Sequence, residues 1–207
     1  MHNMGIHVGF DLDLTLADTR AAIAAVYEAM LPSLDTPIDV AVAVSRIGWP
    51  LESELAQWLP AEEIPAAVTL YRSLYPVIAL PATVAMPGAH EALAAVREAG
   101  GRIIVVTGKN ARDARRTIDA LGLDVDEIAG SVFGADKGAA IAAFGAGVYV
   151  GDHVADVDAA KAGGAISVAV ATGGCTPAQL AAQGADVVLD DLTEFVSWYT
   201  TQASILA

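Results

Sequence analysis

Two pairs of aspartates each follow a short apolar run of the sequence. Asp11 and Asp13 come after the first run, and Asp152 and Asp156 come after a run that ends at residue 150. Runs of this length and composition are typical of buried parallel strands, whose carboxyl ends meet at one edge of a sheet and form a ligand crevice there. We therefore expect the four carboxylates to lie close together.

Such a cluster of carboxylates must be neutralised. Two like charges about 4 Å apart repel by roughly 4 kcal/mol at an effective dielectric constant near 20. Protons on some carboxylates, or a lysine together with a divalent cation, would remove this cost, and an all-oxygen set of ligands favours Mg²⁺ over zinc. Lys137 is the expected lysine, because it opens a helical pattern just after a weaker apolar run at 131–133.

Another apolar run ends in Thr107, Gly108 and Lys109 and brings further polar groups to the same edge. Thr107 fits either a ligand for an anion or the N-cap of the helix expected to begin near 110–113. Asp156 fits either a neighbour of the metal ligands or a plain first-turn residue favoured by the helix dipole. For Lys109 we favour a solvated loop position.

The two ends of the chain predict an α/β fold. Short β-rich runs recur there between alanine-rich helical patterns, as expected of a parallel sheet with helices on both faces. The fold class is therefore a Rossmann-like parallel-sheet core. The predicted strands are 6–10, 103–106, 131–133, 148–150, 166–170 and 187–189, and the predicted helices are 89–99, 111–121 and 137–144.

The middle of the chain instead predicts an all-helical insertion. Helix start signals occur at Asp18, at Thr36 with Pro37, and at Pro50. A fourth helix is expected over 61–75. The prolines that follow it are expected to enforce an extended return to the sheet. They are Pro76, Pro81 and Pro87.

The composition excludes several classes of function. Lys and Arg number 11 against 25 Asp and Glu among 207 residues, and the net charge of −14 argues against binding nucleic acid or an anionic membrane by bulk charge. The longest uncharged stretch, 162–185, is broken by glycines and a proline and does not predict a membrane span. The single cysteine, Cys175, indicates a reducing compartment, and the first residues lack the features of a secretory signal. We expect a cytoplasmic enzyme or binding protein.

Four motifs occur in order along the chain: DLDLTLADT (11–19), VVTGK (105–109), Lys137 and GDHVAD (151–156). Their order and spacing resemble those of the haloacid dehalogenase-like (HAD) hydrolase superfamily. Within it, the chain resembles the branch of phosphoglycolate phosphatase and β-phosphoglucomutase. The resemblance implies a HAD-like α/β core domain over 1–16 and 88–207, with an inserted helical cap domain over 17–87.

The resemblance also implies catalytic roles. Asp11 would be the nucleophile that forms an aspartyl-phosphate, and Asp13 would serve as general acid and then as general base. Thr107 and Lys137 would hold oxygens of the phosphate, helped by the backbone N–H groups that begin at Gly108. The acid at position 13 favours phosphate esters over haloacids as substrates.

For the metal, the resemblance implies Mg²⁺ held by the Asp11 carboxylate, the Asp13 backbone carbonyl and Asp152. Asp156, outside this set of ligands, would orient the ligands or Lys137. The chain departs from the family pattern next to Asp13, because Leu14 stands where a glycine is usual. We expect a leucine there to keep φ negative and its side chain to narrow the entrance.

The implied activity is a Mg²⁺-dependent phosphatase for a small phosphomonoester, either phosphoglycolate-like or sugar-phosphate-like, acting as a monomer or homodimer. Two alternatives stay open: a phosphoglucomutase-type phosphosugar isomerase, and a catalytically silent phosphometabolite-binding protein. Substrate choice is expected at RIGWPL (46–51). There, Arg46 would bind a substrate carboxylate or second anion, or else satisfy a helix end, and Trp49 would form an apolar wall or part of the cap core.

Overall fold

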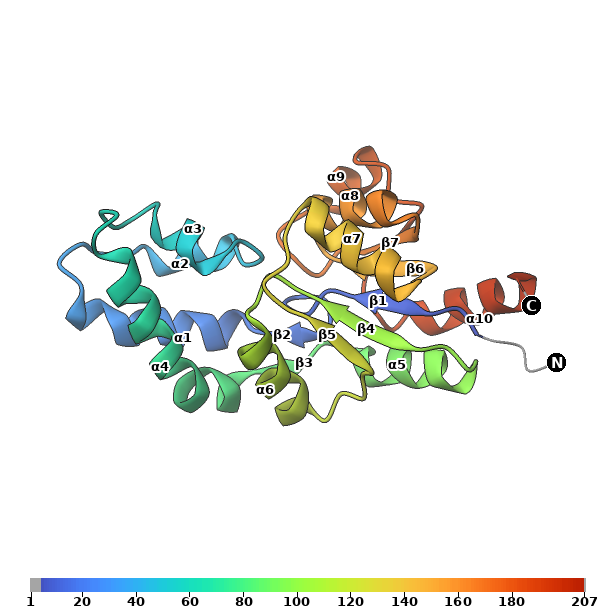
Figure 1. Ribbon diagram of the computed structural model, residues 1–207, viewed down its shortest axis with the longest axis horizontal. Helices are drawn as coiled ribbons and strands as arrows, with labels where there is room; N and C mark the ends of the chain where they lie inside the picture. The colour runs from blue at the N-terminus through green and yellow to red at the C-terminus, as the bar shows by residue number, and fades with distance from the viewer. Residues whose placement is uncertain (1–4, 207) are drawn as a thin grey trace.

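The computed structural model describes residues 5–206 and is built on a six-stranded parallel sheet in the order β5-β4-β1-β6-β7-β8 (Figure 1). In the centre of the sheet, Phe10 lies in register between Val105 and Val150. The strand order reverses direction at β1, so the ligand crevice is expected at the carboxyl end of this strand. The strands are β1 (Val8–Phe10), β4 (Ile103–Val106), β5 (Glu127–Ala129), β6 (Val148–Gly151), β7 (Ile166–Val170) and β8 (Val187–Leu189).

Helices cover both faces of this sheet, because successive strand residues point to opposite sides and both sides are apolar. Val105 packs into the cluster beneath α5, α6 and α10, whereas Val106 packs on the opposite side with α7 and α8. Figure 1 shows these two helical layers with the sheet between them. The predicted α/β fold class is confirmed. The helices are α5 (Ala89–Glu98), α6 (Ala111–Leu121), α7 (Ala135–Phe144), α8 (Val154–Gly163), α9 (Pro177–Ala182) and α10 (Phe195–Leu206).

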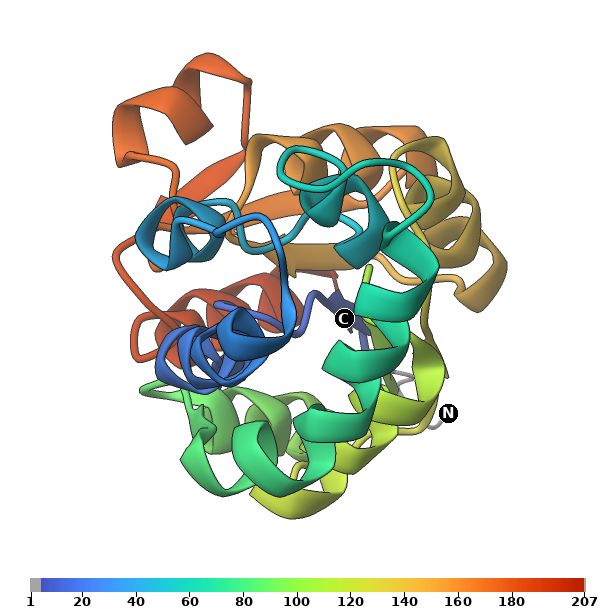
Figure 2. The same ribbon diagram turned by 90° about the vertical axis from the view of Figure 1, so that its left-hand side faces the viewer.

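The remaining helices pack around an apolar cluster of their own, which includes Leu55, Tyr71 and Tyr75. They lie beyond the carboxyl edge of the sheet and face the viewer in Figure 2. We call residues 20–82 the helical segment. A two-stranded antiparallel ribbon, β2 (Ala17–Asp18) with β3 (Val84–Ala85), joins its two ends to the sheet. The segment contains α1 (Arg20–Met30), η1 (Leu31–Ser33), α2 (Val40–Ser45), α3 (Leu51–Leu55) and α4 (Ile64–Ala82).

The extended return predicted after residue 75 is wrong, because α4 continues through Pro76 and Pro81 to Ala82. A proline inside a helix costs roughly 3 kcal/mol, since it removes a hydrogen bond and crowds the preceding turn. Tyr75 and Ala79, in the same part of the helix, are almost wholly buried. Packing of this helix face against α1 and α6 outweighs the local penalty.

A second correction concerns the predicted strand 131–133. The strand at this edge of the sheet is β5, which ends at Ala129, and Ser131 has a positive φ of 59°. A left-handed residue cannot continue an extended ladder, so the chain turns there toward α7. No helix among residues 5–206 combines the length and the apolar character needed to cross a bilayer.

Candidate active site

Three of the four aspartates expected at the carboxyl edge of the sheet meet there, and the expectation is wrong for the Asp13 side chain. Asp11 follows β1, Asp152 follows β6, and Asp156 lies in the first turn of α8. One carboxylate oxygen from each lies within 4.8 Å of those of the other two, and all three residues are buried. The hydroxyl of Thr15 donates to Asp152 Oδ1 at 2.9 Å, and Val150 O accepts from Asp11 N at 2.8 Å. These contacts fix the carboxylates in the cluster.

Lys137, from the first turn of α7, supplies the predicted amine. Its Nζ lies 3.2 Å from Asp11 Oδ1 and 2.7 Å from Asp156 Oδ1. Burial works to lower the pKa of Lys137, but Asp11 and Asp156 outweigh it and raise the pKa well above its ordinary value. The lysine is therefore a permanent cation at this site.

One ammonium does not balance three carboxylates. Burial raises the pKa of Asp11 to about 7, against the lowering effect of Lys137. Burial and the nearby Asp156 likewise raise the pKa of Asp152. Asp11 Oδ1 is buried and, although it lies 3.2 Å from the Lys137 ammonium, accepts no hydrogen bond from residues 5–206. Three oxygen donors with excess negative charge and an unused lone pair fit a hard divalent cation such as Mg²⁺.

Two glycines allow the backbone to close tightly around these carboxylates. A Cβ atom at Gly173 would lie 1.8 Å from Asp152 Oδ2, and one at Gly151 would lie 2.4 Å from the Asp156 side chain. Any side chain at either position would displace an aspartate. Gly173 was not among the residues expected at the site, and only the Gly173–Gly174 pair after a predicted strand marks it in the sequence.

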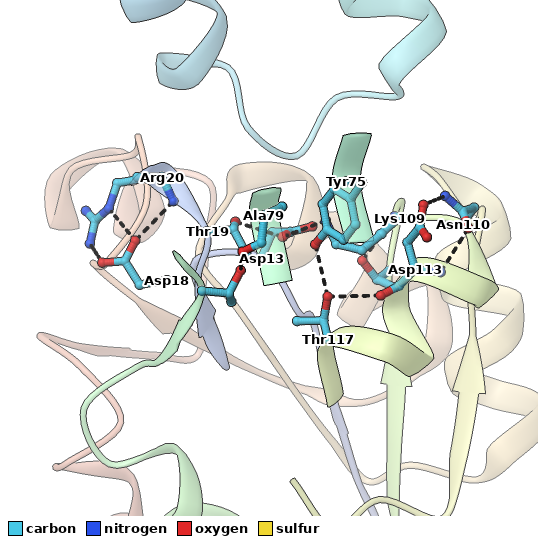
Figure 3. Close-up of polar contacts among 12 residues, drawn as sticks. Asp13, Asp18, Thr19, Arg20, Tyr75, Ala79, Lys109, Asn110, Asp113 and Thr117 are labelled. Carbon is cyan, nitrogen blue, oxygen red and sulfur yellow. Dashed lines mark hydrogen bonds and ion pairs between the residues drawn. The ribbon is translucent and has the colours of Figure 1, made fainter. Parts of the chain in front are cut away.

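The carboxylate of Asp13 points away from this cluster and toward the helical segment. Lys109 Nζ lies 3.0 Å from Asp13 Oδ1, and the Thr19 hydroxyl donates to the same oxygen at 2.8 Å (Figure 3). Lys109 Nζ also lies 4.8 Å from the centre of the Tyr75 ring. The prediction that Lys109 lies in a solvated loop position is wrong. The Asp13 carboxylate and the ring face of Tyr75 take the place of water around its buried ammonium.

Thr107 is buried at the end of β4 and does not cap the helix that follows. Asn110 is the N-cap of α6, and its Oδ1 accepts from Asp113 N at 3.0 Å (Figure 3). The N-cap interpretation of Thr107 is therefore wrong. Its hydroxyl accepts from Lys109 N at 3.2 Å, which helps to order the backbone at Gly108.

His153 has a structural role at the start of α8. It is the N-cap of α8, where its Nδ1 accepts from Ala155 N at 3.1 Å, while Asp156 Oδ2 accepts from His153 N at 3.2 Å. Asp156 thus lies in the first helical turn and also contacts Lys137, which combines both interpretations of this residue.

The turn after Asp13 corrects another expectation. Leu14 has a φ of 62°, in the left-handed region where leucine is uncommon. Its N–H donates to Ala17 O at 2.8 Å, and its carbonyl accepts from the Thr172 hydroxyl at 2.5 Å. These bonds hold a conformation that costs of order 1–3 kcal/mol. The Leu14 side chain is buried, so the side chain does not stand in the entrance.

Two neighbouring cavities open onto the site. One, of about 250 Å³, reaches from Asp11, Asp13 and Thr107 to Arg46 and the aromatic residues of the helical segment. The other, of about 310 Å³, is lined by the aspartate cluster and Lys137. Residues 47–50 line both cavities, so the segment 46–51 reaches the site as expected. Arg46 does not offer a free cation, since its Nη2 lies 2.9 Å from Glu54 Oε1.

Comparison with known proteins identifies the family. A family model described as haloacid dehalogenase-like hydrolase matches residues 7–164, and a second HAD-like hydrolase model matches residues 135–195. The chain belongs to the haloacid dehalogenase-like hydrolases.

Similar individual proteins agree with this assignment. The chain is 32% identical to "Probable phosphatase IndB" of Dickeya dadantii, over 90% of each protein. It is 29% identical to "Phosphoglycolate phosphatase" of Caulobacter vibrioides, over 91% of this chain and 89% of that protein. A haloacid dehalogenase-like hydrolase of Streptococcus pneumoniae shares the fold with a TM-score of 0.82 at 24% identity, over 96% of this chain and 100% of the other. Family and relatives together support a phosphatase enzyme.

Proposed function

We propose that the protein is a Mg²⁺-dependent phosphatase that hydrolyses a small phosphomonoester, phosphoglycolate-like or sugar-phosphate-like, through an aspartyl-phosphate on Asp11. The observation that carries this proposal is the position of Asp11, at the switch point of the sheet. Its carboxylate contacts Lys137 and shares a cluster with Asp152, and it lines both cavities. A nucleophile, a cation and oxygen ligands for a metal thus surround one point where a phosphoryl group can be transferred.

In the first step, a carboxylate oxygen of Asp11 attacks phosphorus while the bond from phosphorus to the ester oxygen breaks. Asp13 gives a proton to the departing alkoxide. In the second step, Asp13 takes a proton from the water that attacks the aspartyl-phosphate, which releases inorganic phosphate and restores Asp11. Thr107, the N–H of Gly108 and Lys137 hold the phosphate oxygens that carry the developing charge.

The metal would be held by the carboxylates of Asp11 and Asp152 and by the backbone carbonyl of Asp13. When bound, Mg²⁺ supplies positive charge to the phosphate oxygens. Asp156 positions Lys137, with which it shares the 2.7 Å contact. The Asp13 side chain has a separate task, consistent with its contact with Lys109 outside the cluster.

Residues 17–87 act as a cap over a core formed by 1–16 and 88–207, of which 1–4 and 207 lie outside the described residues. Support comes from the separate apolar cluster of the helical segment and from the ribbon at its two ends. Hinge motion near 16–19 and 82–87 would admit substrate, and closure would exclude water during the attack. The cytoplasmic location and the monomeric or homodimeric state remain predictions.

The direct test is release of inorganic phosphate from p-nitrophenyl phosphate and from a panel of phosphorylated metabolites, with Mg²⁺ present. Asp11→Asn should abolish turnover, and Asp158→Asn, which alters an exposed carboxylate on α8, should keep it. Rapid acid quenching followed by mass spectrometry should find a phosphoryl group on Asp11.

Three results would redirect the assignment. Turnover that requires a sugar bisphosphate would favour the isomerase. Ligand binding by Asp11→Asn, without phosphate release by the unaltered protein, would favour a silent binding protein. Phosphate release by Asp11→Asn at the unaltered rate would contradict the aspartyl-phosphate mechanism.

A further inference from the structure

The cavity beside Asp13 contains a partly buried ion pair with two unused polar atoms. Glu54 is only 4% exposed, and its Oε1 accepts from Arg46 Nη2 at 2.9 Å and from Trp58 Nε1 at 2.8 Å. The other carboxylate oxygen, Oε2, and the Arg46 Nε are also buried, and neither has a hydrogen-bond partner in the part of the chain that the structure describes. Buried polar atoms are nearly always hydrogen-bonded, so this unmatched acceptor and donor point to a ligand that completes them.

The pair is placed where a substrate can reach it. Arg46 and Glu54 line the same cavity as Asp11 and Thr107, which form its phosphate end under the proposed function. The guanidinium carbon of Arg46 lies 5.6 Å and 5.4 Å from the ring centres of two tryptophans, which hold the side chain in place. These rings belong to Trp49 and Trp58.

Charge in this cavity disfavours a second anion on the substrate. Each of the three cations that line it already has an acidic partner, which offsets the positive charge that a carboxylate in the ligand would meet. Such a carboxylate would also approach Glu54, and like charges repel strongly where water is excluded. The pairs are Arg46–Glu54 at 2.9 Å, Arg72–Glu52 at 2.8 Å and Lys109–Asp13 at 3.0 Å.

We propose that Arg46 and Glu54 select a phosphomonoester whose leaving group is uncharged and hydroxylated, and that they reject one ending in a carboxylate. A hydroxyl of the substrate donates to Glu54 Oε2, and an adjacent oxygen accepts from Arg46 Nε. Aromatic walls with a few placed polar groups suit such a ligand, and the cavity supplies Trp49, Tyr71 and Phe133 as walls. This inference rests on the proposed function and chooses the sugar-phosphate-like class within it.

Two pairs of esters test the charge of the leaving group directly, because one member of each pair carries a carboxylate and the other does not. They are glycerol 3-phosphate with 3-phosphoglycerate, and glucose 6-phosphate with 6-phosphogluconate. We expect kcat/KM to favour the neutral member of at least one pair by about tenfold or more, the equivalent of one hydrogen bond to a charged group. Calorimetry on Asp11→Asn should find the same preference in Kd without turnover.

Glu54→Gln should lower this preference by about tenfold, since it frees the Arg46 charge and removes the repulsion. Glu62→Gln is the matched control, because it removes an exposed carboxylate of the same helical segment that lines neither cavity, and it should keep the preference within about twofold. Thermal melts establish that both variants are folded, and if Glu54→Gln does not fold, the preference of the unaltered protein decides.

Three results would overturn the inference: preference for the carboxylate member in both pairs, no measurable binding of either neutral ester, or an unchanged ratio in folded Glu54→Gln. The proposed function fails separately. Preferential binding of neutral esters without phosphate release would contradict the proposed hydrolysis and support the proposed selection of neutral leaving groups. Hydrolysis without any preference between the two members of each pair would support the hydrolysis and contradict the selection.

Discussion

Removal of either member of the buried pair of Lys109 and Asp13 should strongly destabilise the protein. At 3.0 Å, opposite unit charges attract by about 5–6 kcal/mol at an effective dielectric constant near 20, before the cost of dehydrating them. Removing one member of such a pair leaves the other charge buried alone, which costs about 3–5 kcal/mol. We therefore expect Lys109→Met, which keeps the length of the side chain, to lower the free energy of unfolding by about that amount.

Urea denaturation of both single variants and the double variant isolates the pair. In Lys109→Met/Asp13→Asn no buried charge is left alone, so its loss of stability should be at least about 2 kcal/mol smaller than the sum of the two single losses. Lys161→Met is the control, since Lys161 is exposed and donates only to a backbone carbonyl. It should change stability by less than about 0.5 kcal/mol.

The pH dependence of this effect has a definite sign. Burial works to lower the pKa of Lys109, but electrostatic interactions with Asp13, Tyr75 and Tyr71 outweigh it, so the pKa lies above its ordinary value. The stabilisation is therefore complete below the unfolded pKa of about 10.4 and is lost only as pH rises through the folded value. The penalty of Lys109→Met should be constant between pH 6 and 9. Additive single losses, or a penalty that fades within this range, would refute the reasoning.

Three further predictions follow from other contacts. Because burial raises the pKa of Asp11 to about 7, binding of Mg²⁺ should displace a proton at pH 6 and be tighter at pH 8. Titration calorimetry in buffers of different ionisation enthalpy will measure both effects. At 100 times its Kd, Mg²⁺ should stabilise the protein by about 2.7 kcal/mol. Tyr75→Phe should cost about 1 kcal/mol in urea denaturation, since it removes the 3.0 Å hydrogen bond that joins α4 to Thr117 of α6, and an unchanged midpoint would contradict this. Asp126→Asn should cost about 1–2 kcal/mol of stability at pH 7, because hydrogen bonds from a backbone N–H and from Arg97 outweigh burial and hold the pKa of Asp126 low. This stabilisation is present above the unfolded pKa of about 4 and should vanish as pH falls through the folded value. A difference in stability that persists at pH 2 would count against this prediction.

The acidic cluster follows from the sequence because each aspartate comes directly after, or one turn beyond, an apolar run. Parallel strands bring such positions to one edge whatever the details of packing, so Asp11 and Asp152 are predictable. Lys137 is predictable for a similar reason, since it opens a helix near that edge. The strand order and the helical layers follow from the same alternation of apolar runs and alanine-rich helices.

Features that depend on contacts between distant parts of the chain could not be predicted from local sequence patterns. Lys109 is covered by the ring of Tyr75, which is far away in the sequence. Pro76 stays within α4 because of packing that a local pattern does not contain. Leu14 adopts a positive φ because Thr172 and Ala17 bond to its backbone, whereas the local preference of leucine favours a negative one.

The short ribbon at the base of the helical segment has an engineering consequence. Ala17 pairs with Ala85 and Asp18 with Val84, so the chain departs from the sheet and comes back to it at adjacent points. The helical segment between those points therefore has its two ends side by side. An insertion with adjacent ends can be replaced by another with little strain on the rest of the fold. A foreign helical segment grafted onto this ribbon should therefore leave the register of the sheet unchanged.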